Sequence, residues 1–168
     1  MAAITLDGNP VHTCGDIPKT GSQAIDFELV ATNLSTKTLA DFRNNNLILN
    51  IFPSVGTGIC AASVRAFNIS AAKFKDTKVL CISRDLPFAQ HQFCGAEGIE
   101  NVIMLSDFKN GVFGKNYGLL MTNGIFDGLL SRCVFVINKK GTIIYTEQVP
   151  DIGQEPNYQA ALESIANA

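Results

Sequence analysis

The chemistry of this sequence centres on a cysteine that follows a buried apolar run. Residues 47–52 form a short apolar segment closed by Pro53 and Ser54, which is the pattern of a strand ending in a turn. Apolar side chains then recur at helical spacing from Cys60 onward. A thiol in the first turn of a helix lies beside free backbone N–H groups and the positive end of the helix dipole, which both stabilise a thiolate. The sequence therefore predicts that Cys60 is a nucleophile.

Three other residues can assist this thiolate. Thr57 lies in the turn that enters the helix, where its hydroxyl can hydrogen-bond the sulfur and an incoming oxygen. Arg132 precedes an apolar run and reaches the sulfur if that run pairs with 47–52; its guanidinium would then stabilise the thiolate and an oxyanion released from an O–O bond. Pro53 would close the strand and exclude water. On spacing alone, Thr57 also fits an ordinary helix-entry residue and Arg132 an ordinary strand-end charge.

The remaining cysteines give a different pattern. Five cysteines are an odd number, and the chain shows no export signal, so a secreted disulfide framework is not expected. Cys81 and Cys133 lie inside apolar runs and are expected to be inert core residues, whereas Cys14 lies in a Gly-flanked loop and is expected to be exposed or half exposed, with no role assigned. No C-x-x-C occurs, and His12 and His91 stand far from any paired cysteines, so we expect no metal and no other cofactor.

The elements that would position these residues follow from apolar runs and turn signals. Strands are expected at 4–6, 11–13, 47–52, 79–83, 102–105, 133–137 and 142–147, and helices from 59, over 86–95, around 112–117 and over 155–165. Residues 25–30 form a further short apolar segment. Asp85 is the expected N-cap of the second long helix, with Pro87 in its first turn. This order predicts one α/β domain over residues 1–168 with a thioredoxin-like fold: a central mixed sheet flanked by helices, and an N-terminal β-hairpin.

Composition excludes several classes of function. The chain of 168 residues is 46% hydrophobic and 17% charged, which is typical of a globular domain. A net charge of -2 without a Lys/Arg cluster argues against a surface for nucleic acid or for an anionic membrane. No apolar run reaches membrane-spanning length, and the N-terminus lacks the features of a secretory signal. We therefore expect a cytoplasmic protein.

Several spaced segments resemble one known family. They are residues 53–68, 80–83, 85–90, 93–98, 131–132 and 155–162, which together extend over nearly the whole chain. The first of them, Pro53-Ser-Val-Gly-Thr57-Gly-Ile-Cys60, is similar to the active-site segment of bacterial thiol peroxidases, the atypical two-cysteine peroxiredoxins. One departure is Gly56, which stands where close relatives are expected to have an aspartate.

The resemblance implies roles for particular residues. Cys60 aligns with the peroxidatic cysteine, Cys94 with the resolving cysteine, Thr57 and Pro53 with the motif threonine and proline, and Arg132 with the active-site arginine. A hydroperoxide would oxidise Cys60 to a sulfenic acid, Cys94 would condense with it, and thioredoxin would reduce the resulting disulfide. The two cysteines lie on different predicted helices, so both segments are expected to unwind partly in each cycle. The family is commonly homodimeric, and the resemblance implies a homodimer here.

Two other functions fit parts of the pattern. A thiol–disulfide oxidoreductase of thioredoxin type is disfavoured because Thr57 occupies the position of the first cysteine of a C-x-x-C. A non-catalytic thioredoxin-fold binding module or holdase would use exposed apolar surface instead. Apolar residues around a Gly-rich loop could line a site for alkyl hydroperoxides, form a dimer face, or simply pack in the core: Phe113, Tyr117, Leu119, Leu120, Met121, Ile125 and Phe126.

Overall fold

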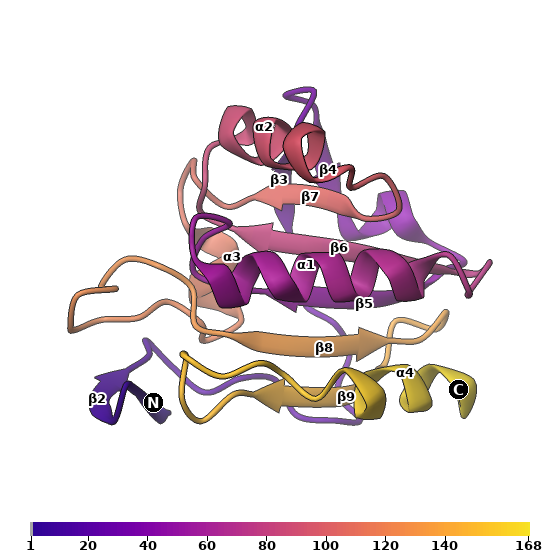
Figure 1. Cartoon of the computed structure of the whole chain (residues 1–168). Coiled ribbons are helices and arrows are strands. Elements are labelled where there is room, and N and C mark those ends of the chain that lie inside the picture. Colours follow the sequence, from indigo (N-terminus) through magenta and orange to yellow (C-terminus); the bar gives the residue numbers. More distant parts are fainter. Residues whose placement is uncertain (1) are drawn as a thin grey trace.

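One large mixed sheet organises the chain in the computed structural model, which describes residues 2–168 (Figure 1). Within those residues seven strands join it, in the order β4-β3-β7-β6-β5-β8-β9. Their bounds are β3 Glu28–Ala31, β4 Thr36–Thr38, β5 Asn46–Ile51, β6 Thr77–Ser83, β7 Ile103–Ser106, β8 Cys133–Ile137 and β9 Ile143–Gln148. The central strands β5, β6 and β7 are parallel, whereas β8 pairs antiparallel with β5 and β9 antiparallel with β8. This topology confirms the predicted thioredoxin-like fold.

A separate hairpin precedes the sheet. Strands β1 (Ala3–Leu6) and β2 (Asn9–His12) pair antiparallel with Leu6 opposite Asn9. The two turn residues, Asp7 and Gly8, have φ of 50° and 79°, as a two-residue turn with the twist of a hairpin requires. The predicted N-terminal hairpin is thus confirmed.

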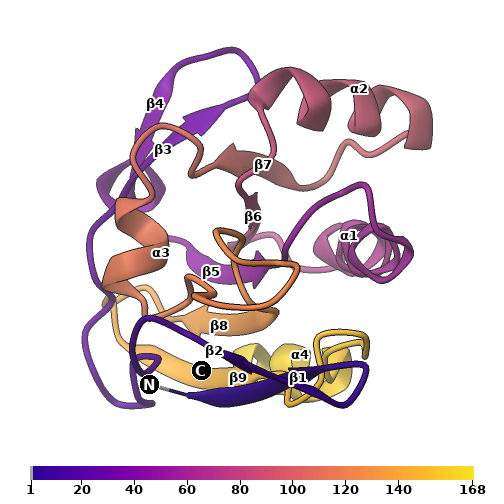
Figure 2. The same cartoon turned by 90° about the vertical axis from the view of Figure 1, so that its left-hand side faces the viewer.

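Helices cover both faces of the sheet (Figure 2). On one face lie α1 (Gly58–Ala71), α2 (Pro87–Glu97) and α4 (Tyr158–Ala166), and on the other lie the short α3 (Val112–Asn116) and the 3-10 helix η1 (Leu39–Phe42). Strand β5 shows why two layers form. Leu47, Leu49 and Ile51 pack in the core cluster under α3, while Ile48 packs in the cluster under α1, so the strand is apolar on both faces.

Two details of the predicted elements are corrected by the structure. The polar stretch before residue 46 contains β4 and η1, which sequence patterns did not indicate. Asp85 is not the N-cap of α2, because Leu86 takes that position with extended backbone angles, and no side chain caps the helix. Pro87 opens the helix as expected.

The apolar residues around the Gly-rich loop differ in burial, and Leu120 and Phe126 are only partly buried. Phe113, Tyr117, Leu119 and Met121 are buried in core clusters, so core packing accounts for them. Ile125 is 87% exposed and contributes nothing to the core.

Candidate active site

Cys60 lies where the strand–turn–helix pattern places it. Helix α1 begins at Gly58 with Thr57 as its N-cap, and the Thr57 hydroxyl accepts a hydrogen bond from the Cys60 N–H at 3.4 Å. The same hydroxyl lies 3.4 Å from the Ser54 carbonyl oxygen, to which it donates. Cys60 is 0% exposed, so its sulfur is shielded from bulk water within the first turn of the helix. Pro53 is also buried, between the end of β5 and this turn.

Arg132 meets the sulfur of Cys60 across the sheet. Because β8 pairs antiparallel with β5, with Cys133 opposite Ile51, the residue just before β8 lies beside the turn that follows β5. The Arg132 Nη2 donates to Cys60 Sγ at 3.3 Å, and its Nε donates to the Ile152 carbonyl at 2.9 Å. The guanidinium is buried, and its Nη1 finds no acceptor among residues 2–168. A buried donor of this kind is available to an oxygen atom of a substrate.

The carbonyl that orients this arginine is itself held by the N-terminal hairpin. The Asp151 carboxylate accepts hydrogen bonds from Thr5 Oγ1 at 2.7 Å, Gly153 N at 2.9 Å and Gly8 N at 3.1 Å. These bonds, led by that of the Thr5 hydroxyl, lower the pKa of Asp151 to about 2. The Thr5 N–H also donates to the Pro150 carbonyl, and the Thr5 carbonyl accepts from the Ile152 N–H. Sequence reasoning missed this support, because the group that contacts Arg132 is a backbone carbonyl without a side-chain signature.

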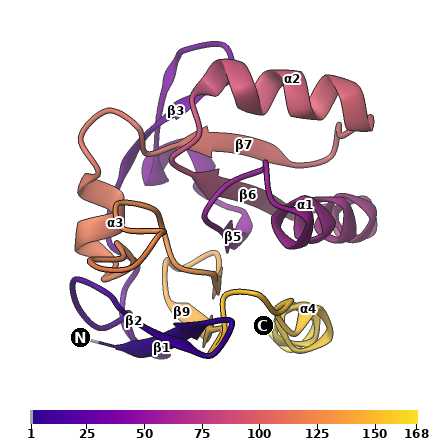
Figure 3. The ribbon, with the colours of Figure 1, turned by 60° about the vertical axis from the view of Figure 1, so that its left-hand side comes forward.

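Cys94 lies on α2, away from the first turn of α1. The two helices run as separate rods over the same face of the sheet (Figure 3). Cys94 is half-buried against the cluster that also contains Cys60, and burial raises the pKa of its thiol. Both thiols are free. A hollow of about 460 Å³ adjoins Cys94 and is lined by both α2 and β7 residues, including His91 and Ile103.

The other cysteines lie where they were expected. Cys81 and Cys133 are 0% exposed within central strands, and burial raises the pKa of each thiol to about 12. They therefore stay protonated and unreactive at neutral pH. Cys14 is exposed, as are His12 and His91.

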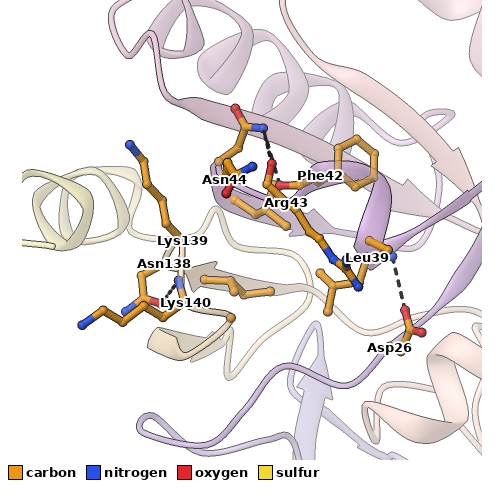
Figure 4. A pocket seen from close by; sticks show the side chains of 13 residues that line it. Asp26, Leu39, Phe42, Arg43, Asn44, Asn138, Lys139 and Lys140 are labelled. Carbon is orange, nitrogen blue, oxygen red and sulfur yellow. Dashed lines mark hydrogen bonds between the residues drawn. The ribbon is translucent and has the colours of Figure 1, made fainter.

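A second hollow, of about 440 Å³, lies at the opposite end of β5 (Figure 4). Phe42, Leu47 and Ile137 line it together with Arg43 and Lys140, but no cysteine or histidine does. The Arg43 side chain extends toward one side of the hollow while Lys140 points away from it, so the cations do not converge. No thiol or imidazole lines this hollow, so it offers no site for the thiol chemistry that is expected at Cys60.

A buried thiol at a helix start, bonded by a buried guanidinium on a thioredoxin-like sheet, defines a class of thiol-dependent redox proteins. The Redoxin family model matches residues 19–162, so the chain belongs to the Redoxin family. Thiol peroxidases of Mycobacterium tuberculosis (strain H37Rv) and Mycobacterium bovis are each 50% identical to it over 165 residues, 98% of this chain and 99% of theirs. The chain is thus a homologue of the thiol peroxidases along nearly its full length.

Solved structures agree with this assignment. A peroxiredoxin-like protein from Aquifex aeolicus superposes with a TM-score of 0.94 at 33% identity, over 99% of this chain and 97% of that one. A thiol peroxidase from Chromobacterium violaceum gives a TM-score of 0.90 over 98% and 95% of the two chains, and at 18% identity it supports the fold alone. Within residues 2–168 no helix is both long and apolar enough to cross a membrane.

Proposed function

We propose that this protein reduces hydroperoxides, with Cys60 as the attacking thiolate and Cys94 as its disulfide partner. The observation that carries the proposal is the 3.3 Å hydrogen bond from the buried Arg132 guanidinium to the buried Cys60 sulfur. A thiolate at this position accepts a charge-assisted hydrogen bond from the guanidinium, and the thiolate is the form of cysteine that attacks peroxides. The 50% identity to thiol peroxidases supports the same reaction class.

The first step is displacement at oxygen. The Cys60 thiolate attacks the terminal peroxide oxygen, an S–O bond forms, the O–O bond breaks, and the leaving alkoxide takes a proton to become an alcohol, or water when the substrate is hydrogen peroxide. The unpaired Nη1 of Arg132 is placed to stabilise the oxygen that becomes negative. Thr57 fixes the first turn around the sulfur, and Pro53 contributes to the exclusion of water.

The second step joins the two cysteines. The Cys94 thiolate attacks the sulfenic sulfur of Cys60, which releases water and forms the disulfide. Because the two residues lie on separate intact helices, the Cys94 segment and the first turn at Cys60 must unwind before the sulfurs meet. Release from its half-buried position also removes the burial that raises the pKa of Cys94, so the movement activates the thiol that it delivers.

The proposal extends to the partners of the cycle. An intramolecular disulfide is regenerated by a dithiol, and thioredoxin is the reductant that we propose. A cytoplasmic location is part of the proposal, because five cysteines are an odd number and do not form the disulfide framework of a secreted domain. A homodimer is part of the same proposal and is carried by the family resemblance.

A single-turnover experiment tests this function. The reduced protein is mixed with a slight excess of cumene hydroperoxide, and the oxidised cysteines are mapped by mass spectrometry in the wild type, in Cys94→Ser and in the control Cys14→Ser. We expect a Cys60–Cys94 disulfide in the wild type and the control, and sulfenic or sulfinic acid on Cys60 in Cys94→Ser. A folded protein whose Cys60 stays reduced would refute the peroxidase and favour a binding module.

A further inference from the structure

The Asp85 carboxylate takes no part in the two steps described above. It accepts three short hydrogen bonds: from Ser54 Oγ at 2.6 Å, from Ser83 Oγ at 2.6 Å and from the Val55 N–H at 2.9 Å. Two of these donors belong to the turn between Pro53 and Cys60, and the third belongs to the end of β6. The carboxylate therefore joins two segments that are about thirty residues apart in sequence.

The turn depends on this carboxylate through Ser54. The Ser54 hydroxyl donates to Asp85 while accepting from the Gly56 N–H at 3.0 Å, and the Ser54 carbonyl accepts from Thr57 N at 3.2 Å. Thr57 in turn caps the helix at Cys60. A continuous series of hydrogen bonds thus runs from Asp85 to the backbone N–H of the nucleophile.

On its other side Asp85 is hydrogen-bonded to residues of strands β6 and β7. The Ser83 hydroxyl that donates to it accepts from Gln90 Nε2 at 3.2 Å, and the Asp85 carbonyl accepts from the Ser106 hydroxyl. Gln90 is itself buried and also donates to the Leu105 carbonyl at 2.9 Å. Asp85 is followed directly by Leu86, the N-cap of the helix that carries Cys94. The start of that helix and the turn before Cys60 therefore share one anchor.

We propose that Asp85 is a positioning residue that holds the turn before Cys60 in its peroxide-reactive form and slows the opening that lets Cys94 reach it. The inference rests on the proposed function. Loss of the carboxylate then has two opposite effects. Attack on peroxide slows because Thr57 and the first turn lose their fixed geometry, while disulfide formation accelerates because the turn opens more readily.

The variant Asp85→Asn separates these effects. An amide retains one acceptor oxygen, so it cannot accept from both Ser54 Oγ and the Val55 N–H with the geometry of a carboxylate. Rapid-quench mixing with cumene hydroperoxide, followed by alkylation and mass spectrometry, counts the reduced, sulfenic, disulfide and sulfinic forms of Cys60. We expect oxidation to slow and disulfide formation to accelerate, each by about tenfold, the factor that one hydrogen bond to a charged group supplies. Less sulfinic acid per turnover should accumulate at high peroxide.

A second readout needs no peroxide. Hydrogen exchange of the reduced protein should show faster exchange in residues 54–60 of Asp85→Asn and unchanged exchange in β5. Asp41→Asn is the matched control, because that exposed carboxylate likewise accepts from one backbone N–H and one hydroxyl, both of Thr38, far from Cys60. If Asp85→Asn fails to fold, Ser54→Ala removes the hydroxyl bond from the turn to Asp85 and leaves the bonds from the Val55 N–H and from Ser83.

The outcomes distinguish this inference from the function on which it rests. If the wild type completes the cycle and Asp85→Asn or Ser54→Ala matches it in both rates, the inference is overturned. If both rates fall together and sulfinic acid rises, Asp85 is merely structural and the inference is again overturned. If Cys60 of the folded wild type does not react with peroxide, the proposed function fails, and the exchange experiment still decides whether Asp85 anchors the turn.

Discussion

Replacing Arg132 with methionine removes the charge nearest to the Cys60 sulfur. At 3.3 Å, two unit charges in surroundings with an effective dielectric of about 20 attract by about 5 kcal/mol. This is an upper bound, because both groups lose hydration when they are buried. Loss of one donor to a developing oxyanion lowers rates in other enzymes by about 100- to 1,000-fold. We therefore expect Arg132→Met to lower the second-order rate constant for oxidation of Cys60 by about 1,000-fold.

The assay is rapid-quench oxidation by cumene hydroperoxide with mass detection, because the chain contains no tryptophan for a fluorescence signal. Arg132→Lys should give an intermediate rate, since one ammonium group cannot reproduce the two directed bonds to the sulfur and to the Ile152 carbonyl. Arg43→Met is the control, because it removes the same charge from the second hollow, at the opposite end of β5. Folded Arg132→Met that retains the wild-type rate constant within about threefold would refute the reasoning.

Three further results are expected. Thr57→Val removes the N-cap of α1 and should lower the free energy of unfolding by about 1 kcal/mol in urea titrations, whereas an unchanged midpoint would contradict the capping role. The pKa of Asp151 falls from 3.8 to about 2 on folding, so the stability that its carboxylate contributes is present above pH 4 and is lost as the pH falls toward 2. Asp151→Asn should therefore flatten this part of the curve of Tm against pH, and a variant curve parallel to that of the wild type would contradict the role of Asp151. Iodoacetamide at pH 8 should modify Cys14 of the native protein but spare Cys81 and Cys133, whose pKa values are raised to about 12, and label on either buried thiol before unfolding would disprove the assignment.

Local patterns in the sequence were sufficient to place Cys60 in the first turn of a helix. Three patterns were enough: the apolar run of β5, the Pro53 turn and the helical spacing after Cys60. All lie within about thirty residues, and each depends only on residues that are close together in the sequence. Arg132 needed one further fact, the pairing of β8 with β5, which sequence reasoning stated as a condition and the structure provides.

The elements that were missed depend on contacts between distant segments. An aspartate just before a helix fits an N-cap, but the donors of Ser54 and Val55 engage the Asp85 carboxylate instead, and no local rule indicates them. Strand β4 lies at the edge of the sheet with no buried residue, so it lacks the apolar alternation by which strands are recognised.

The support of Arg132 has a consequence for synthesis of the chain. The arginine is oriented by the Ile152 carbonyl, and that turn is fixed by a hairpin from the other end of the described chain. A ribosome-bound chain that has emerged only through β8 already carries Cys60 but lacks the turn that aims the guanidinium at it. The guanidinium therefore acquires its hydrogen bond to the Ile152 carbonyl only after β9 and the turn that follows it have been made.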